Sequence, residues 1–151
     1  PLHEGHSGFR IDQIDAQIST WLPAAHPDVI VLMAGTNDAA QGLTGGAARM
    51  GTLLDHIAVY RPDAQIYVST IPPINPSAGG GTFPSSHLAE VHNSELPAVI
   101  SAKAAAGLHV HLINAAGALS IANLDVGGIH LTPTGYSNFA TLLLAGLPAF
   151  P

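Results

Sequence analysis

The sequence predicts a three-layer α/β/α domain built round a parallel sheet, and three observations carry this prediction. Short apolar runs rich in β-branched residues occupy 28–34, 65–69 and 109–114. They alternate with segments in which apolar residues recur at helical spacing. The 151 residues show no repeat, no low-complexity tract and no internal linker, so we expect one domain over residues 1–151.

The helices are predicted from apolar spacing and from residues that start or stop a helix. The first is expected over 11–22, ending before Pro23. The third is expected over about 86–106, closed by Gly107. The second shows its apolar side at Met50, Leu53, Leu54 and Ile57.

The last helix is predicted to begin near Pro133, because proline suits the first helical position and Thr132 is a good N-cap. We expect this helix to bury one apolar face. The residues of that face are Tyr136, Phe139, Ala140 and Leu143.

The strands place three chain segments at one edge of the sheet. In the run 28–34 every residue after Asp28 is apolar, as expected for a parallel strand buried on both faces. It ends at a Gly-Thr-Asn-Asp turn, residues 35–38, while 71–85 and 115–131 are predicted to be loops. Ligand sites of parallel sheets lie at the carboxyl ends of the strands, so we expect the site there.

Composition excludes several classes of partner. Four Lys and Arg oppose ten Asp and Glu, giving a net charge of −6 and no basic patch for nucleic-acid phosphates. The longest apolar stretches, such as 29–34 and 142–147, are too short to span a bilayer, so no membrane partner is expected. Cysteine is absent, which excludes disulfides and thiolate catalysis.

Three residues at the strand ends suggest acyl-transfer chemistry. Asn37 follows a buried strand and can present its side-chain amide above the sheet. Together with a glycine N–H, for which Gly8 is the candidate, this amide would form an oxyanion hole. His130 lies in a loop just before the last helix and could act as a general base at neutral pH.

A metal site is not expected. His3 with His6, and His109 with His111, are the candidate ligand pairs. Zinc needs three or four ligands, and no cysteine or His-Glu motif joins either pair.

Three ordered blocks resemble those of the SGNH (GDSL-type) hydrolases: His3-Glu4-Gly5-His6-Ser7-Gly8-Phe9-Arg10-Ile11-Asp12-Gln13-Ile14, Gly35-Thr36-Asn37-Asp38 and Ile129-His130-Leu131-Thr132-Pro133-Thr134-Gly135-Tyr136. The resemblance is to the acetylxylan-esterase-like branch in particular. It implies a flavodoxin-like sandwich and hydrolysis of esters, often of acetylated sugars, without a metal or organic cofactor. It also implies secretion, and makes Gly8 and Asn37 the oxyanion-hole donors and His130 the base.

The chain departs from the family pattern at two points. The family's nucleophile lies in a Gly-Asp-Ser block after its first strand, upstream of the block that begins near His3. We therefore expect an N-terminally truncated domain that lacks this strand, and the open sheet edge would favour a homodimer or a rearranged sheet. The family's usual Asp, three residues before the histidine, is Gly127 here, and Asp125 is the candidate substitute that would orient His130.

Two functional readings follow from the missing block. The first is a serine-esterase-type hydrolase acting on small acyl esters, such as acetyl esters of carbohydrates. Ser7 is a candidate nucleophile for it, although Phe9 breaks the Gly-x-Ser-x-Gly pattern of a nucleophile elbow. The alternative is a catalytically inactive remnant or fragment that serves as a binding or scaffold domain.

Overall fold

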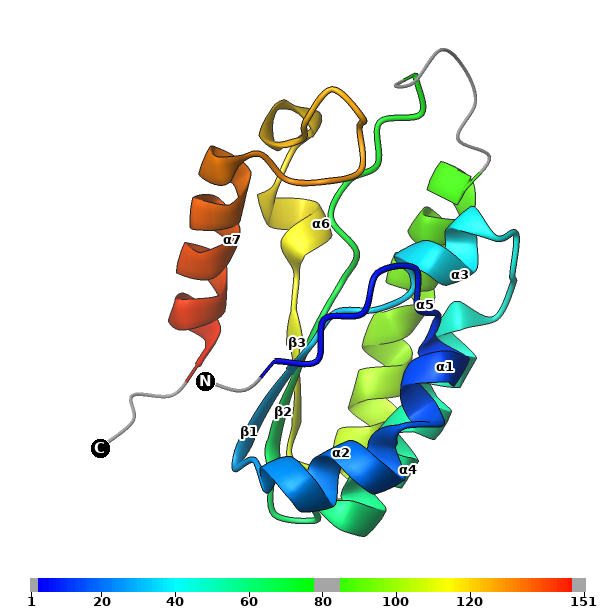
Figure 1. The fold of residues 1–151 in the computed structure, drawn as a ribbon, viewed down its shortest axis with the longest axis vertical. Helices are drawn as coiled ribbons and strands as arrows, with labels where there is room; N and C mark the ends of the chain where they lie inside the picture. The colour runs from blue at the N-terminus through cyan, green and yellow to red at the C-terminus, as the bar shows by residue number, and fades with distance from the viewer. Residues whose placement is uncertain (1–2, 78–84, 148–151) are drawn as a thin grey trace.

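The computed structural model describes residues 3–77 and 85–147, and within them the sheet has three parallel strands in the order β1-β2-β3 (Figure 1). They are β1 (Val29–Leu32), β2 (Gln65–Ser69) and β3 (Val110–Ile113), which confirms the predicted strands. Leu32 pairs with Val68, and Ser69 pairs with Ile113. This register brings the segments that follow the strands out at the same edge of the sheet.

Helices flank the sheet on two sides (Figure 1). One side carries α1 (Ile11–Asp15), α2 (Ile18–Ala25), α4 (Gly46–Tyr60) and α5 (Ser85–Ala105), and the other carries α7 (Pro133–Gly146). None of the helices in the described ranges is long and apolar enough to cross a bilayer. The predicted apolar side of α4 lies in the main core, with exposed fractions of 1% or less: Met50, Leu53, Leu54 and Ile57.

The predicted helix over 11–22 is wrong in two respects. It is broken into α1 and α2, and α2 passes through Pro23 and ends at Ala25. Pro23 is exposed, so its ring meets solvent rather than a packed neighbour, and the helix loses a single backbone hydrogen bond there. His26 caps the helix: its backbone is left-handed (φ 49°), and its N–H donates to the Leu22 carbonyl.

The last helix begins as predicted, but it does not bury the predicted face. The Thr132 hydroxyl accepts from the Gly135 N–H at 3.1 Å, and Pro133 is the first helical residue. Tyr136 is 55% exposed and Ala140 is also exposed, whereas Phe139 and Leu143 are half-buried. Tyr136 lines the pocket described below, and Ala140 lies one turn further on the same face of α7. The face of α7 that carries Tyr136 and Ala140 therefore borders the open pocket and does not pack against the sheet.

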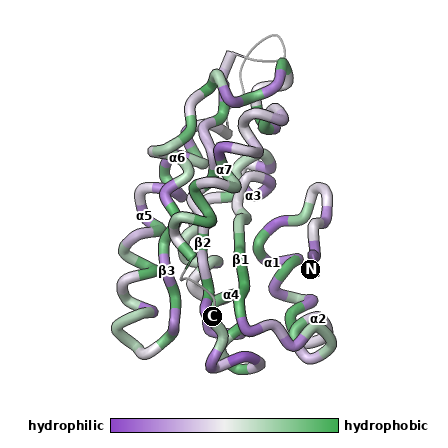
Figure 2. The backbone as a smooth tube through the Cα atoms, turned by 90° about the vertical axis from the view of Figure 1, so that its left-hand side faces the viewer, coloured by the Kyte–Doolittle hydropathy of each residue, from purple (hydrophilic) through white to green (hydrophobic). Residues whose placement is uncertain are grey.

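The β1 strand forms an edge of the described sheet and also exposes part of one face, which overturns the expectation that it is buried on both faces. It pairs with β2 on one side and with no other described strand. Figure 2 shows β1 as an apolar segment at the margin of the sheet, next to α1. Val31 is 46% exposed and Met33 is 42% exposed, so the described elements cover this face only in part. An apolar edge strand of this kind is a template for pairing with another chain.

The two predicted loops differ in character. Residues 71–77 form no helix or strand, as predicted, and 78–84 lie outside the described residues. The segment 115–131 is more regular than predicted, with α6 (Ala115–Ala118), a 3₁₀ turn (Ile121–Asn123) and a bridge between Leu124 and Leu131. Its apolar residues form a second small core against α7, which gives this segment its order.

Candidate active site

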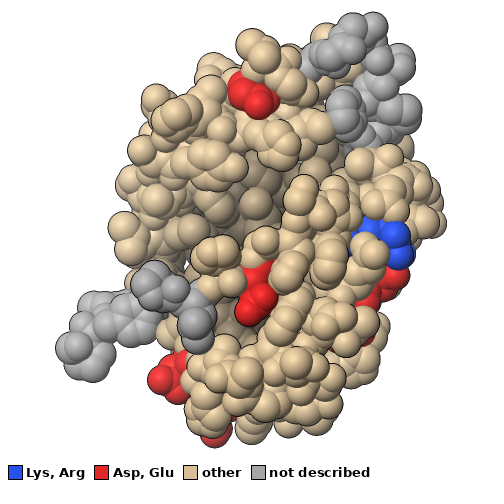
Figure 3. Space-filling model, viewed as in Figure 1, with Lys and Arg blue, Asp and Glu red and all other residues tan. Residues whose placement is uncertain are grey.

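A pocket of about 490 Å³ opens at the carboxyl ends of the strands, a typical size for a small-molecule site. Figure 3 shows it as a hollow in the face of the molecule, with an acidic side chain at its rim. Ser7, Gly8, Asn37 and His130 all line it, so the structure brings these predicted residues together. Most of the lining comes from residues 4–9, 33–37, 71–72 and 129–131.

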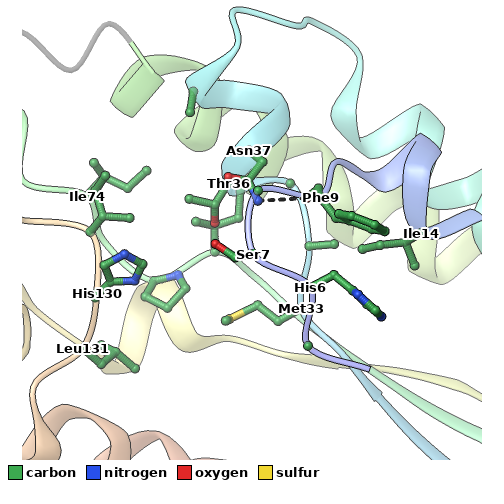
Figure 4. A pocket seen from close by; sticks show the side chains of 18 of the residues that line it. His6, Ser7, Phe9, Ile14, Met33, Thr36, Asn37, Ile74, His130 and Leu131 are labelled. Atoms are coloured by element: carbon green, nitrogen blue, oxygen red, sulfur yellow. Dashed lines mark hydrogen bonds between the residues drawn. The ribbon is translucent and has the colours of Figure 1, made fainter. Parts of the chain in front are cut away.

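The Asn37 side chain lies where the sequence predicts, directly after β1. Gly35 adopts a left-handed backbone (φ +119°), which lets the chain turn from β1 into α3 (Thr36–Ala40). The Asn37 Nδ2 donates to the Phe9 carbonyl at 2.8 Å, as Figure 4 shows. A primary amide has two N–H donors, so this bond fixes the amide and leaves a second donor for a ligand in the pocket.

The second predicted donor, Gly8, lies in a turn closed by the Phe9 N–H on the His6 carbonyl at 3.3 Å. Its φ of +80° favours glycine. A Cβ added at Gly8 would meet no atom within 4 Å, so the space in front of this backbone is open. Since Asn37 binds the next residue, the Gly8 turn and the Asn37 amide are tied together.

Asp38 holds these two segments in place, and sequence reasoning did not identify this role. Its carboxylate is 1% exposed and accepts from the Ile11 N–H at 2.9 Å and from the Arg49 Nε at 2.8 Å. These bonds join the start of α1, α3 and α4. One feature of the sequence could have indicated this role: Asp38 is an acidic residue directly after Asn37, in a chain with only 9% charged residues.

The His130 backbone is anchored, while its ring is exposed at the pocket. The His130 carbonyl accepts from the Asp125 N–H at 2.8 Å, next to the Leu124–Leu131 bridge. The Thr132 N–H donates to the Asn123 carbonyl at 2.8 Å, which closes the loop before α7. Among the described residues, none forms a hydrogen bond with the His130 ring.

The Asp125 carboxylate is directed to its own turn. Its Oδ1 accepts from the Gly128 N–H at 3.1 Å, and Asp125 does not line the pocket. The structure therefore brings Asp125 next to His130 through the backbone but does not join their side chains. Its role in orienting the ring stays a prediction.

Ser7 reaches the pocket from the N-terminal turn. In Figure 4 it lies between His130 and His6, below Thr36. The His6 ring is stacked between Phe9 and Trp21, with centroid distances of 4.7 and 4.6 Å, and its Nε2 pairs with Glu4 at 3.0 Å. These contacts keep His6 away from Ser7 and leave His130 as the candidate base.

The histidine pairs considered as metal ligands have other contacts. The His111 ring stacks on Tyr67 and pairs with Gln65 at 3.1 Å, while His6 is held as described above. Throughout residues 3–77 and 85–147, no group of three or more metal-ligating side chains is present.

Two curated proteins are similar to this chain in sequence, and one of them is named an esterase. The curated protein named "Putative endoglucanase X", from Acetivibrio thermocellus, is 26% identical over 134 residues, which are 87% of this chain and 55% of that protein. The protein named multidomain esterase, from Ruminococcus flavefaciens, is 31% identical over 94 residues, which are 52% of this chain and 12% of that protein. The chain thus spans about half of the first relative and a small part of the second.

Two solved structures of carbohydrate esterases are similar to this chain in fold. The family 3 carbohydrate esterase of Clostridium thermocellum has a TM-score of 0.81 at 27% identity, with 95% of this chain and 67% of that chain covered. The family 3 carbohydrate esterase from Talaromyces cellulolyticus has a TM-score of 0.82 at 23% identity, with 95% and 68% covered. The second likeness supports the fold alone. Both similarities agree with the predicted three-layer arrangement, in which helices flank a parallel sheet.

The family follows from the sequence profile described as "GDSL-like Lipase/Acylhydrolase family", which matches residues 2–137. This match covers the Gly8 turn, the Asn37 segment and the His130 loop, and it confirms the resemblance to SGNH-type ester hydrolases. The chain belongs to the GDSL-like lipase/acylhydrolase family.

Proposed function

We propose that this chain forms the acyl-binding site of a serine-type ester hydrolase that acts on small acyl esters of carbohydrates. The observation that carries the proposal is the shared pocket of Gly8, Asn37 and His130, drawn from distant parts of the sequence. The names of the carbohydrate esterases and the multidomain esterase support the substrate class.

Each residue has a distinct task in this proposal. The Asn37 amide and the Gly8 N–H stabilise the negative charge that develops on the ester carbonyl oxygen. His130 takes the proton of the attacking hydroxyl and later gives it to the leaving alcohol. To hold the ring in place during the reaction, the Asp125 carboxylate would have to turn from the Gly128 N–H to the ring, or a backbone carbonyl would have to accept from it.

The nucleophile has two candidate sources. Ser7 lines the pocket itself. The other source is a serine carried on an additional strand, and the unpaired edge of β1 supports this route because a further parallel strand would end at the same pocket.

Hydrolysis of p-nitrophenyl acetate tests the proposal. We expect the chain to release nitrophenolate faster than buffer, and His130→Ala to lower that rate by about 10²–10⁴-fold, because the general base is lost. His87→Ala, an exposed histidine on α5, is the matched control and should keep the rate. A wild-type rate equal to buffer would contradict hydrolysis by Ser7 or by any other hydroxyl of these 151 residues.

Ser7→Ala in the same assay identifies the attacking group. With Ser7 as nucleophile, the rate falls as far as in His130→Ala, and combining the two changes lowers it no further. A rate unchanged by Ser7→Ala, but lost in His130→Ala, assigns the attack to another hydroxyl.

A second candidate function is a binding domain without catalysis. The observation that favours it is that no described hydroxyl forms a hydrogen bond with the His130 ring, although Ser7 lines the same pocket. Such a domain would bind acetyl esters in the same pocket without hydrolysing them, so the assay above separates the two functions.

The open edge of β1 leads us to propose that the chain forms a homodimer. Light scattering after size-exclusion chromatography is expected to give twice the monomer mass of 15.4 kDa. Val31→Lys should shift the protein to monomer, because charge on an edge strand opposes pairing. Val59→Lys, on the exposed side of α4, is the control, and a wild-type monomer would contradict this prediction.

A further inference from the structure

His92, on α5, is buried, and its ring forms no hydrogen bond with any residue that the structure describes. Its exposed fraction is 3%, and neither ring nitrogen is bonded to another atom of the described chain. Buried polar atoms are nearly always paired, because leaving one unpaired loses its hydrogen bonds to water without replacement. Hydrogen bonds of the ring therefore do not explain why a histidine is buried at this position.

The ring lies between two glycines that leave room for it. A Cβ at Gly35 would lie 3.2 Å from the His92 Cε1 and Nε2, and a Cβ at Gly46 would lie 2.7 Å from its Nδ1. Gly35 is the left-handed residue that starts α3, two positions before Asn37. The imidazole therefore fills the space directly behind the segment that carries the Asn37 amide.

We propose that His92 is a positioning residue, whose neutral imidazole holds Gly35 in place and thereby fixes the direction of the Asn37 amide. In naming Asn37 as the oxyanion donor, the inference rests on the proposed function. His92 lies so close behind Gly35 that an added Cβ would press on its ring, and it does not line the acyl pocket.

The charge state of the ring gives this arrangement a pH dependence. Burial lowers the pKa of His92, the Asp38 carboxylate on α3 raises it, Arg49 on α4 lowers it, and Glu95 on α5 raises it. Because the folded pKa lies below the unfolded value of about 6.5, the unfolded chain binds more protons in the window between them. The contribution to stability is therefore complete above about pH 6.5 and is lost as the pH falls toward the folded pKa.

Protonation also has a structural consequence. The added charge would lie in the core near Arg49, whose Nη2 is itself buried and unpaired within the described chain. A cavity of about 40 Å³, lined by His92 with Gly35, Asp38 and Gly46, gives the ring room to shift. A shift of the ring releases Gly35, so Asn37 loses its fixed direction at acid pH.

An NMR titration from about pH 8 to about pH 5 tests the inference, since histidine titrates in this range. Proton–nitrogen spectra follow the Gly35 amide and the Asn37 side-chain amide, and proton–carbon spectra follow the His92 ring. We expect all three signals to move with one midpoint below about 6.5. Constant Gly35 and Asn37 signals during titration of the His92 ring would overturn the inference.

Two variants keep the test decisive. In His92→Leu the common movement of the Gly35 and Asn37 signals should vanish, whereas His87→Leu should retain it; movement that persists in His92→Leu overturns the inference. Gly46→Ala presses its Cβ on the ring, so the Gly35 and Asn37 signals should be displaced at neutral pH. Gly46→Ala is the deciding variant if His92→Leu does not fold, or if the protein unfolds before the His92 ring titrates. Gly35 and Asn37 signals that do not move in Gly46→Ala would then refute the positioning role of His92. Chemical shifts need no hydrolysis, so an inactive chain can still support this inference, and an active one can refute it.

Discussion

Asn37→Ala is expected to lower kcat for p-nitrophenyl acetate by about 10²–10³-fold, with a smaller change in KM. The amide lies at the pocket, where its bond to the Phe9 carbonyl fixes it beside the Gly8 turn. Its remaining N–H stabilises charge that develops only in the transition state, so its loss affects kcat first. Steady-state kinetics of purified wild-type and variant chains measure the effect.

The control for this change is Asn138→Ala, which removes an exposed amide from α7. Because Asn37 also binds Phe9, circular dichroism and thermal melting must show that Asn37→Ala remains folded. A folded Asn37→Ala variant with the wild-type kcat would remove Asn37 from the oxyanion hole.

Asp38→Ala is expected to reduce the free energy of unfolding by about 3–5 kcal/mol, because it leaves the Arg49 guanidinium without its buried partner. It also leaves the Ile11 N–H unpaired. For a domain of this size, the loss corresponds to a fall in Tm of about 10 °C. Urea unfolding or calorimetry measures the change.

Asp55→Ala is the matched comparison, since Asp55 forms an exposed ion pair with Lys103 on the surface. Such pairs contribute about 0–1 kcal/mol, so Asp55→Ala should unfold close to wild type. Equal stability losses in Asp38→Ala and Asp55→Ala would show that Asp38 does not anchor the site. A double variant with Arg49→Ala should recover part of the loss, because neither charge is then left unpaired.

Much of the fold could be predicted because local signals and tertiary structure agree. The strand Gln65–Ser69 is confirmed with its predicted bounds, since polar residues flank its apolar run on both sides. The start of α7 is confirmed because Thr132 and Pro133 each favour a helix N-terminus through their own chemistry. In both cases the signal lies within a few residues.

The predictions of burial and of helix ends are wrong where they depend on residues far away in the sequence or on a covering element that the described residues do not supply. The exposure of Val31 and Tyr136 follows from the open edge and the hollow beside it, which the pattern of apolar residues cannot show. The continuation of α2 through Pro23 depends on that residue facing solvent. Burial predicted from apolar character alone assumes that a covering element is present.

The candidate site shows the same division. Gly8, Asn37 and His130 were identified from ordered motifs, and the structure gathers them at one pocket. Asp38 and His92 were not identified, because their importance lies in contacts with Arg49, Ile11 and Gly35 from other elements. A sequence shows residue types with suitable chemistry, whereas the residues that hold them in place become visible only in three dimensions.

The central claim is that the Gly8 N–H, the Asn37 amide and the His130 ring surround the position of an ester carbonyl. A crystal structure of the chain soaked with acetate, the product of acetyl-ester hydrolysis, tests this claim most directly. We predict one carboxylate oxygen accepting hydrogen bonds from the Gly8 N–H and the Asn37 Nδ2, with the other oxygen facing His130. Acetate bound elsewhere, or a pocket in which these groups point away from one another, would contradict the account.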